Sequence, residues 1–330
     1  MSTLSEKKAI QIHFAPLQGY TDSYYRNAHE AAFGGIDAYY TPFVRLEKGH
    51  TFRSRDLRDI SSEHNHVGKL IPQIIASTPD EMKELADVLI KNGHTSADLN
   101  LGCPFPMIAR RHKGAGLLPY ADEVEALLKT IQDISQLRFS LKMRLGWHSS
   151  NEILSLAHML NDAPLSHICL HARNGEQQYK GTTDLEGFSQ FYHICRVPLL
   201  FNGDIRTTQD INTIMTQFPN LEGVMIGRGL LSNPALALEY KNGKTLEMND
   251  KKNRMRQLHH DIYSAYRDYL QGDRQVLDKI KPFWDYLTDE LEKRTRKKIE
   301  KASKIDAYEN AVVTAFSQWG KVEHYSDNKE

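Results

Sequence analysis

A single cysteine stands between a glycine and a proline in the segment DLNLGCPFPMIARRHKGAGLL, residues 98–118. Cys103 could be a buried core thiol, one ligand of a metal site or a reacting group. The other two cysteines, Cys169 and Cys195, are distant in sequence, and no C-x-x-C pair occurs. This spacing predicts neither a disulfide framework nor a cysteine zinc site. It favours free thiols in a reducing cytoplasm.

The histidine clusters at 64–66 and 259–260 also lack the spacing of metal ligands, and we expect them on the surface. We therefore predict no metal site.

Polar residues end or interrupt nearly every short apolar run in residues 9–228. Buried polar side chains are unfavourable unless they are paired, so a whole set of them indicates a site rather than packing. In chain order the set is Gln18, Gln73, Asn100, Cys103, Lys142, Arg144, His171, Arg173, Asn202, Asp204 and Arg228.

Lys142 leaves two chemistries open. A fixed cation can stabilise negative charge on a flavin ring, whereas an aldolase-type lysine forms a Schiff base. The stretches FNGDI and IGRG place glycines at the ends of two apolar runs. Backbone N–H groups bind phosphate at such turns, so a phosphate-bearing ligand is predicted there.

Eight apolar runs must position these residues, and most are followed by a helical pattern. Short runs of this kind are typical of buried parallel strands. Eight strand-then-helix units predict a (β/α)8 TIM barrel, with a doubly wound sheet as the alternative. The runs are 9–16, 36–44, 69–75, 96–102, 138–145, 166–172, 197–204 and 222–228, and the clearest helical patterns are 79–93, 120–134, 151–162 and 208–218.

The regular pattern is interrupted once and ends near residue 240. Residues 45–68 are polar with little periodicity, which predicts a long loop near the active-site face. Residues 239–252 read as a polar linker, and 253–320 show helical spacing without strand signals. We thus predict a catalytic barrel over 1–240 and a small helical domain over 241–330, ending in a loose tail at 321–330.

Composition and charge narrow the class of protein. The 330 residues are 40% hydrophobic and 25% charged, which is typical of globular enzymes. We expect no signal peptide and no membrane span. The net charge is zero, but residues 251–304 hold 15 Lys and Arg against 9 Asp and Glu. A basic segment favours a polyanionic partner, with a solvated helical face as the alternative.

The motifs APLQGYTD, PQI, DLNLGCPFP, LKMRLGW, HARNGEQQYKG, FNGDI and VMIGRGLLSNP follow one another in a characteristic order. In order and spacing they resemble the tRNA-dihydrouridine synthases over about residues 10–240. The resemblance implies an FMN-binding TIM barrel followed by a helical tRNA-binding domain. We also expect a cytoplasmic protein without a stable protein partner. The resemblance also implies that NADPH reduces FMN, that hydride passes to uracil C6, and that Cys103 protonates C5.

The resemblance further implies roles for individual residues. Cys103 would be the general acid, while Asn100 and Arg173 would face the substrate. The residues implied for FMN binding are Pro16, Leu17, Gln73, Lys142, His171, Asn202, Gly203, Asp204, Gly227 and Arg228.

Two positions depart from the family pattern. Met107 stands where many members have lysine, and Asn174 stands where a hydroxyl residue is common. Both belong to loops expected to meet RNA, as does the basic run at 110–113. Three alternatives remain at this point: a flavin barrel acting on a free pyrimidine or other small molecule, a lysine-dependent aldolase, and a non-enzymatic RNA-binding protein.

Overall fold

The computed structural model describes residues 9–320, which divide by packing into two compact units. Residues 9–18 and 36–227 form the first unit, called here the barrel unit. Residues 19–35 and 228–320 form the second, called here the helical unit. Each is described by itself.

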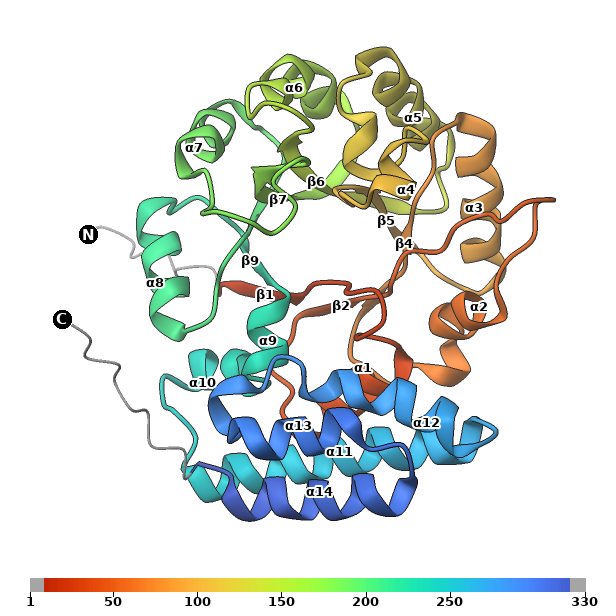
Figure 1. The fold of residues 1–330 in the computed structure, drawn as a ribbon. Coiled ribbons are helices and arrows are strands. Elements are labelled where there is room, and N and C mark those ends of the chain that lie inside the picture. The colour runs from red at the N-terminus through yellow and green to blue at the C-terminus, as the bar shows by residue number, and fades with distance from the viewer. Residues whose placement is uncertain (1–8, 321–330) are drawn as a thin grey trace. The chain divides into compact units, whose positions relative to one another are not determined.

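All eight predicted strands are present in the barrel unit and form one parallel sheet (Figure 1). Its order is β3-β2-β1-β9-β8-β7-β6-β5-β4. The strands are β1 (Gln11–Phe14), β2 (Ala38–Tyr40), β3 (Leu70–Ile71), β4 (Gln73–Ile74), β5 (Ser96–Leu101), β6 (Arg138–Gly146), β7 (Leu165–Asn174), β8 (Leu199–Asn202) and β9 (Gly223–Ile226).

The sheet closes on itself through the run at 69–75. Strands β3 and β4, the two ends of the sheet order, are separated only by Pro72. Proline has no N–H to donate, but the Pro72 carbonyl still accepts from the Asp98 N–H at 2.9 Å. β3 and β4 therefore act as one strand, and the predicted TIM barrel is confirmed against the doubly wound alternative.

Small and apolar side chains fill the barrel interior. The cluster contains Ala15, Tyr40, Cys169 and Met225, each at most 4% exposed. The Cys169 thiol contacts the Met225 sulfur at 3.3 Å, and burial raises the pKa of Cys169 to about 12. Cys169 is thus a core thiol, and each buried methylene of this cluster contributes roughly 0.8 kcal/mol.

Helices surround the barrel, and the four expected patterns are confirmed. Side chains cap their starts: Thr78 caps α3 ahead of Pro79, and Thr207 with Asp210 forms a capping box on α8. The helices are α2 (Ser54–Ile60), α3 (Pro79–Lys91), α4 (Pro106–Ala109), α5 (Ala121–Asp133), α6 (Glu152–Asp162), α7 (Leu185–Ile194) and α8 (Thr208–Gln217).

The loop predicted at 45–68 was wrong in part, because it contains α2 and the 3-10 turn Ser62–His64. Helix α2 has only seven residues, too few to produce a helical period.

The helical unit is built from two separate parts of the sequence. Its helices are α1 (Ser23–Ala32), α9 (Arg228–Ser232), α10 (Leu236–Asn242), α11 (Met248–Tyr269), α12 (Asp273–Ile280), α13 (Lys293–Lys301) and α14 (Ile305–Gln318). Helix α1 packs on α11: the Tyr266 hydroxyl donates to Asp22 at 2.8 Å, and Arg254 donates to the Ala32 carbonyl at 2.7 Å.

The predicted linker at 239–252 is shorter than expected, since α10 ends at Asn242 and α11 begins at Met248. The catalytic and RNA-binding roles assigned to 1–240 and 241–330 remain predictions. The predicted loose tail at 321–330 lies outside the described residues.

The surface position predicted for the histidines at 259–260 is wrong for one of them, which lies in the core of the helical unit. His260 is exposed, but His259 is 5% exposed and lies 2.7 Å from the Tyr308 hydroxyl. It follows Met255 and precedes Ile262 on the buried face of α11. Its helical spacing therefore places it in the core. Within residues 9–320, no helix is both long and apolar enough to cross a membrane.

Candidate functional site

The sheet register places the predicted polar residues on neighbouring strands of the barrel. Asn100 pairs with Lys142, Arg144 pairs with His171, and His171 pairs with Asn202. These residues stand toward the carboxyl ends of β5, β6, β7 and β8, where TIM-barrel enzymes carry their chemistry. Gln73 on β4 pairs with Asp98, two residues before Asn100 on β5.

The Cys103 loop, residues 102–105 after β5, is held by side-chain and backbone contacts. Asn100 Oδ1 accepts from the N–H groups of Gly102 at 3.0 Å and Cys103 at 2.9 Å. The Cys103 carbonyl accepts from the Ala115 N–H at 3.0 Å. The thiol is half-buried, and burial raises its pKa. These contacts fix a protonated thiol at the end of a strand.

Lys142 on β6 and Asn202 on β8 form a polar pair, and only β7 lies between their strands. Lys142 Nζ donates to Asn202 Oδ1 at 3.0 Å, and Asn202 Nδ2 donates to the Met225 carbonyl at 2.7 Å. Burial lowers the pKa of Lys142. Because the hydrogen-bond acceptor is a neutral amide, the ammonium charge remains available to an anionic group.

Arg144 connects two loops. Its guanidinium, 1% exposed, donates to the carbonyls of Gly102 at 2.9 Å, Asn174 at 2.8 Å and Gln178 at 2.7 Å. Burial lowers its pKa to about 10. The sequence marks Arg144 as a polar strand residue, but only the structure reveals that it ties the Cys103 loop to the loop after β7.

Sequence reasoning missed Tyr179, which lies in the loop after β7. Its ring is 44% exposed, centred 5.4 Å from the Arg144 guanidinium carbon and 6.4 Å from the His171 ring. The tyrosine in HARNGEQQYKG was the available signal, yet nothing in the sequence places its ring over Arg144.

The buried pair His171 and Arg173 lies on β7. Arg173 Nη1 is 3.4 Å from His171 Nε2, and Arg173 Nη2 donates to the Gly181 carbonyl at 2.7 Å and forms an ion pair with Asp204. The guanidinium is only 1% exposed. These contacts join the ends of β7 and β8, and the predicted contact of Arg173 with substrate stays a prediction.

The glycine turns at the ends of β8 and β9 lie against predicted cofactor positions. A Cβ on Gly203 would lie 2.6 Å from Thr183 Cγ2, and one on Gly227 would lie 3.6 Å from Leu17 Cδ1. Pro16 and Leu17 are half-buried after β1. Arg228 begins α9 in the helical unit, so its predicted phosphate contact stays a prediction.

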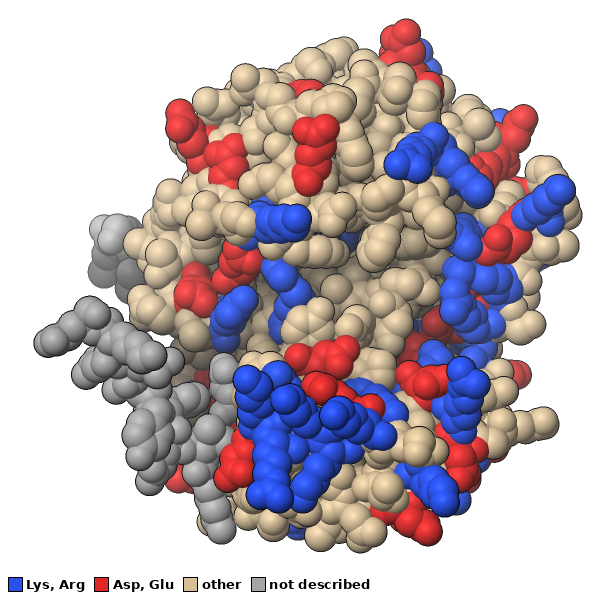
Figure 2. All heavy atoms as spheres, viewed as in Figure 1, with Lys and Arg blue, Asp and Glu red and all other residues tan. Residues whose placement is uncertain are grey.

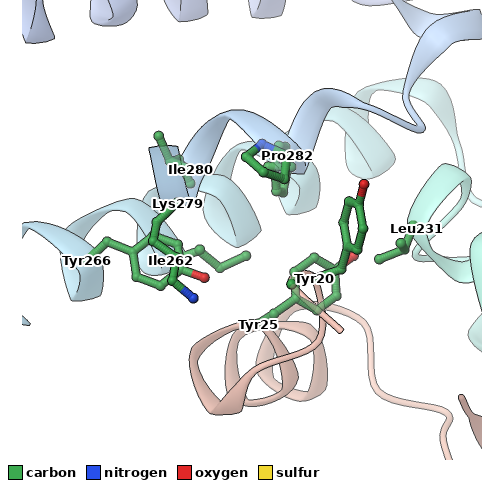
Figure 3. A pocket seen from close by; sticks show the side chains of 10 residues that line it. Tyr20, Tyr25, Leu231, Ile262, Tyr266, Lys279, Ile280 and Pro282 are labelled. Atoms are coloured by element: carbon green, nitrogen blue, oxygen red, sulfur yellow. The ribbon is translucent and has the colours of Figure 1, made fainter. Parts of the chain in front are cut away.

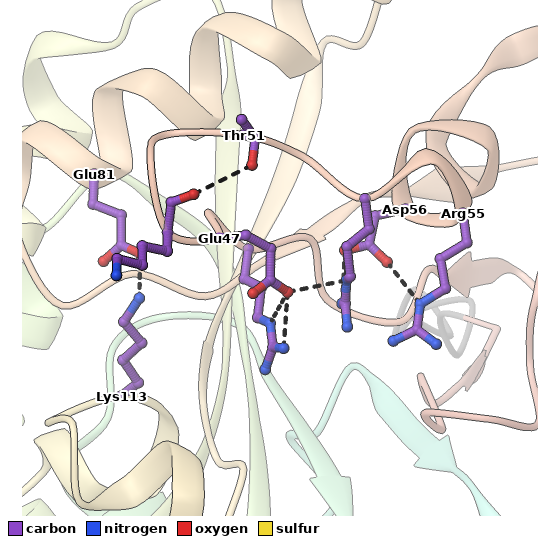
Figure 4. Close-up of polar contacts among 9 residues, drawn as sticks. Glu47, Thr51, Arg55, Asp56, Glu81 and Lys113 are labelled. Carbon is purple, nitrogen blue, oxygen red and sulfur yellow. Dashed lines mark hydrogen bonds and ion pairs between the residues drawn. The ribbon is translucent and has the colours of Figure 1, made fainter.

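The basic run after Cys103 divides into two halves. Arg110 and Arg111 are exposed. His112 stacks on Tyr120 with ring centroids 3.8 Å apart, and Lys113 forms an ion pair with Glu81 (Figure 4). Only the arginines therefore project freely toward a partner.

The two departures from the family pattern differ in surroundings. Met107, on α4, is 78% exposed. Asn174 contacts its own loop and the loop after β6: Oδ1 accepts from the Gln177 N–H at 2.9 Å and Nδ2 donates to the His148 carbonyl at 3.1 Å.

Ion pairs order the polar segment before α2. Arg45 and Arg53 both contact Glu47, at 2.8 and 3.4 Å, and Arg53 contacts Asp56 at 2.7 Å (Figure 4). The segment thus presents arginines on a fixed scaffold.

A cavity in the helical unit is lined by Tyr20, Tyr25, Tyr266 and Lys279, among others (Figure 3). None of its lining residues is among the predicted site residues. Among the side chains that the structure describes, no three from His, Cys, Asp or Glu gather as metal ligands.

Comparison with known proteins finds relatives over most of the chain. "tRNA-dihydrouridine synthase B" of Vibrio cholerae is 28% identical over 264 residues, covering 78% of each chain. "tRNA-dihydrouridine(16) synthase" of Pseudomonas syringae is 29% identical over 236 residues, covering 69% of this chain and 74% of that one.

Solved structures share the fold at low identity. Morphinone reductase superposes with a TM-score of 0.53 at 9% identity, over 73% of this chain and 88% of that one. Histamine dehydrogenase from Rhizobium superposes with a TM-score of 0.54 at 12% identity, over 76% of this chain and 49% of that one. The family model for dihydrouridine synthase (Dus) matches residues 13–319. With a barrel, a loop cysteine and that match over nearly its whole length, the chain belongs to the dihydrouridine synthase family.

Proposed function

We propose that this enzyme reduces uridine in tRNA to 5,6-dihydrouridine, with FMN as its cofactor and NADPH as the reductant. The observation that carries the proposal is the half-buried Cys103 thiol, held by Asn100 beside the basic residues of β6. Uridine gains a hydride at C6 and a proton at C5, while NADPH is oxidised to NADP⁺. Family membership and the names of the relatives support the substrate class.

The donor set suits FMN. Carboxamides, an ammonium and an imidazole meet along the strand ends, which matches a ring with both donor and acceptor edges. FMN, when bound, supplies the hydride. We assign Gln73, Lys142 and His171 to the flavin ring, with Pro16 and Leu17 packing beside it. The residues assigned to the ribityl chain and phosphate are Asn202, Gly203, Asp204, Gly227 and Arg228.

Cys103 acts as the general acid. A proton donor must be protonated before the reaction, and burial raises the pKa of this thiol. The positive charges of Arg144 and Lys142 act in the opposite direction on that pKa. The same positive charges stabilise the negative charge that develops on the pyrimidine ring. A thiol protonated at neutral pH next to fixed cations suits proton donation to C5.

The target base must leave the RNA stack to reach a strand end inside a barrel. We assign Asn100 and Arg173 to the substrate side. Asn100 acts through the Cys103 loop, whose N–H groups it binds. Arg173 acts by holding the ends of β7 and β8 together.

Helix α13 supplies a surface for RNA. Five of its cations, Lys293, Arg294, Lys297, Lys298 and Lys301, are exposed. Among the described side chains, no ion pair engages any of these five, and Figure 2 shows the resulting blue patch over α13. Such a surface binds phosphates by releasing counterions.

All three cysteines are free, which agrees with a cytoplasmic location.

The experiment is reduction of an unmodified tRNA transcript by the purified chain with FMN and NADPH, followed by nucleoside mass spectrometry. We expect dihydrouridine, release of FMN on denaturation, and loss of most product in Cys103→Ala while NADPH oxidation persists. Cys195→Ala is the matched control and keeps the parental rate. Turnover of free uracil without RNA would favour the small-molecule oxidoreductase instead. A Cys103→Ala enzyme with parental activity on tRNA would refute the general-acid assignment.

A further inference from the structure

A chain of buried hydrogen bonds leads from the barrel interior to the Cys103 loop. Gln73 Nε2 donates to Asp98 Oδ2 at 2.6 Å, and Asn100 Nδ2 donates to Gln73 Oε1 at 2.7 Å. Asn100 Oδ1 then accepts from the N–H groups of Gly102 and Cys103. Asp98 and Gln73 are fully buried. Asp98 is therefore the inner end of a chain that finishes on the backbone of Cys103.

The chain has one direction, because Asp98 at its inner end can only accept when ionised and the backbone N–H groups of Gly102 and Cys103 at its outer end can only donate. A carboxylate accepts hydrogen bonds and does not donate them, whereas each carboxamide has one donating and one accepting end. Asp98 thus requires the NH₂ of Gln73, which turns Oε1 of Gln73 toward Asn100. Asn100 must then present its NH₂ to Gln73 and its oxygen to the loop. A reversed chain would turn an NH₂ group against the Cys103 N–H, donor against donor.

We propose that Asp98 is a positioning residue that orients Gln73 and Asn100 and thereby holds Cys103 in place for proton donation. The inference rests on the proposed function, because it assigns a purpose to the Cys103 geometry. It adds a residue that touches neither substrate nor cofactor.

The free-energy cost of burying this carboxyl group indicates that Asp98 does more than occupy space in the core. Burial raises the pKa of Asp98 to about 7, and hydrogen bonds from Ser140 and Gln73 and the charge of Lys142 oppose that rise. An apolar side chain of similar size would fill the same space without desolvating a charge. The remaining oxygen, Oδ1, accepts from Ser140 Oγ at 2.6 Å, so both oxygens are engaged.

The test measures alkylation of Cys103 by iodoacetamide in the full purified chain, followed by peptide mass spectrometry. Cys195 is the internal reference, since it is half-buried and donates to a backbone carbonyl in the same unit. In Asp98→Ala, Gln73 loses its fixed acceptor, so Asn100 and the Cys103 loop are held less firmly. We expect Cys103 to react about fivefold faster relative to Cys195. Gln73→Met breaks the chain one bond later and gives the same result. It also tests the inference if Asp98→Ala does not fold.

Two further variants separate positioning from packing. Ser140→Ala removes the other hydrogen bond to Asp98, and the Cys103 rate stays within about twofold of the parent. Asp98→Asn keeps an oxygen that can accept from Gln73, so we expect Cys103 to be alkylated at close to the parental rate in this variant. In the RNA assay, Asp98→Ala lowers kcat about tenfold and leaves KM for tRNA nearly unchanged.

An unchanged Cys103 rate in both Asp98→Ala and Gln73→Met would overturn the inference. So would a parallel rise of Cys103 and Cys195, which indicates general loosening. Alkylation needs no RNA or NADPH, so its result stands apart from the proposed function, whose failure appears as a parent chain that forms no dihydrouridine.

Discussion

A Cβ atom added to Gly114 would lie 2.7 Å from the carbonyl oxygen of Cys103 and 2.8 Å from its Cβ. Gly114 also has a φ of +60°, in the left-handed region that glycine adopts most readily. The two residues are eleven positions apart, yet the place of Cys103 depends on the absence of a side chain at 114.

Gly114→Ala is therefore expected to displace the Cys103 loop. Backbone strain lowers the free energy of unfolding by about 1–3 kcal/mol, and the contact moves the thiol, so dihydrouridine formation falls further than stability does. Urea unfolding and the tRNA assay measure the two effects. Gly243→Ala is the control, because Gly243 has a φ of +62° with no atom within 4 Å of the added Cβ. Equal activity losses in both variants would contradict the prediction.

Lys142→Met is expected to weaken FMN binding and to lower the midpoint potential of the bound flavin by on the order of 30 mV. The reason is the loss of a cation that favours the more negative, reduced ring. Spectroelectrochemistry measures the potential, and fluorescence of released FMN measures occupancy. Lys129→Met is the control, since Lys129 is 68% exposed and pairs with Glu125. A potential that Lys142→Met leaves unchanged would remove the lysine from this role.

The double variant Lys297→Ala/Lys298→Ala on α13 is expected to bind tRNA more weakly and with a shallower salt dependence. Each lost phosphate contact reduces the slope of log K against log salt by roughly 0.7–0.9. Fluorescence anisotropy over a salt series gives both quantities. Lys83→Ala/Lys91→Ala on α3, also exposed, keeps the parental slope. If both double variants reduce the salt slope equally, the net charge of the protein rather than α13 is responsible.

His259 predicts a pH dependence of stability. Burial lowers its pKa to about 3, while the unfolded chain titrates near 6.5. Between these values the unfolded state binds more protons, so the free energy of unfolding falls with falling pH, by up to about 1.4 kcal/mol per unit. The neutral form is held by the Tyr308 hydroxyl, whose oxygen accepts from Trp284 Nε1 at 3.0 Å.

Urea unfolding between pH 4.5 and 7, followed by tryptophan fluorescence, measures this slope. We expect His259→Gln to remove its share of the slope and the exposed His260→Gln to retain it. A His259→Gln slope equal to that of the parent would show that another group is responsible.

The strands were predictable because a buried parallel strand must be apolar over its length, and all eight runs became strands. Helix α7 was not predictable from its sequence, LEGFSQFYHI. Gly187 and the aromatic residues inside it favour helix only weakly, although Asp184 caps its start. The packing of α1 on α11 is a tertiary contact that no local pattern encodes. Among site residues, sequence marked Asn100 and Lys142 by their polarity. It did not reveal the carbonyls around Arg144, because loop paths decide them.

The split origin of the helical unit bears on how the chain is made. Helix α1 leaves the ribosome some 200 residues before α11, its packing partner. At about 5–20 residues per second it waits on the order of 10–40 s with its apolar face uncovered. Its buried positions include Arg26 and His29, whose polarity makes that waiting helix less prone to aggregation. A fragment starting at residue 228 would lack α1 altogether, so a C-terminal fragment does not contain the complete helical unit.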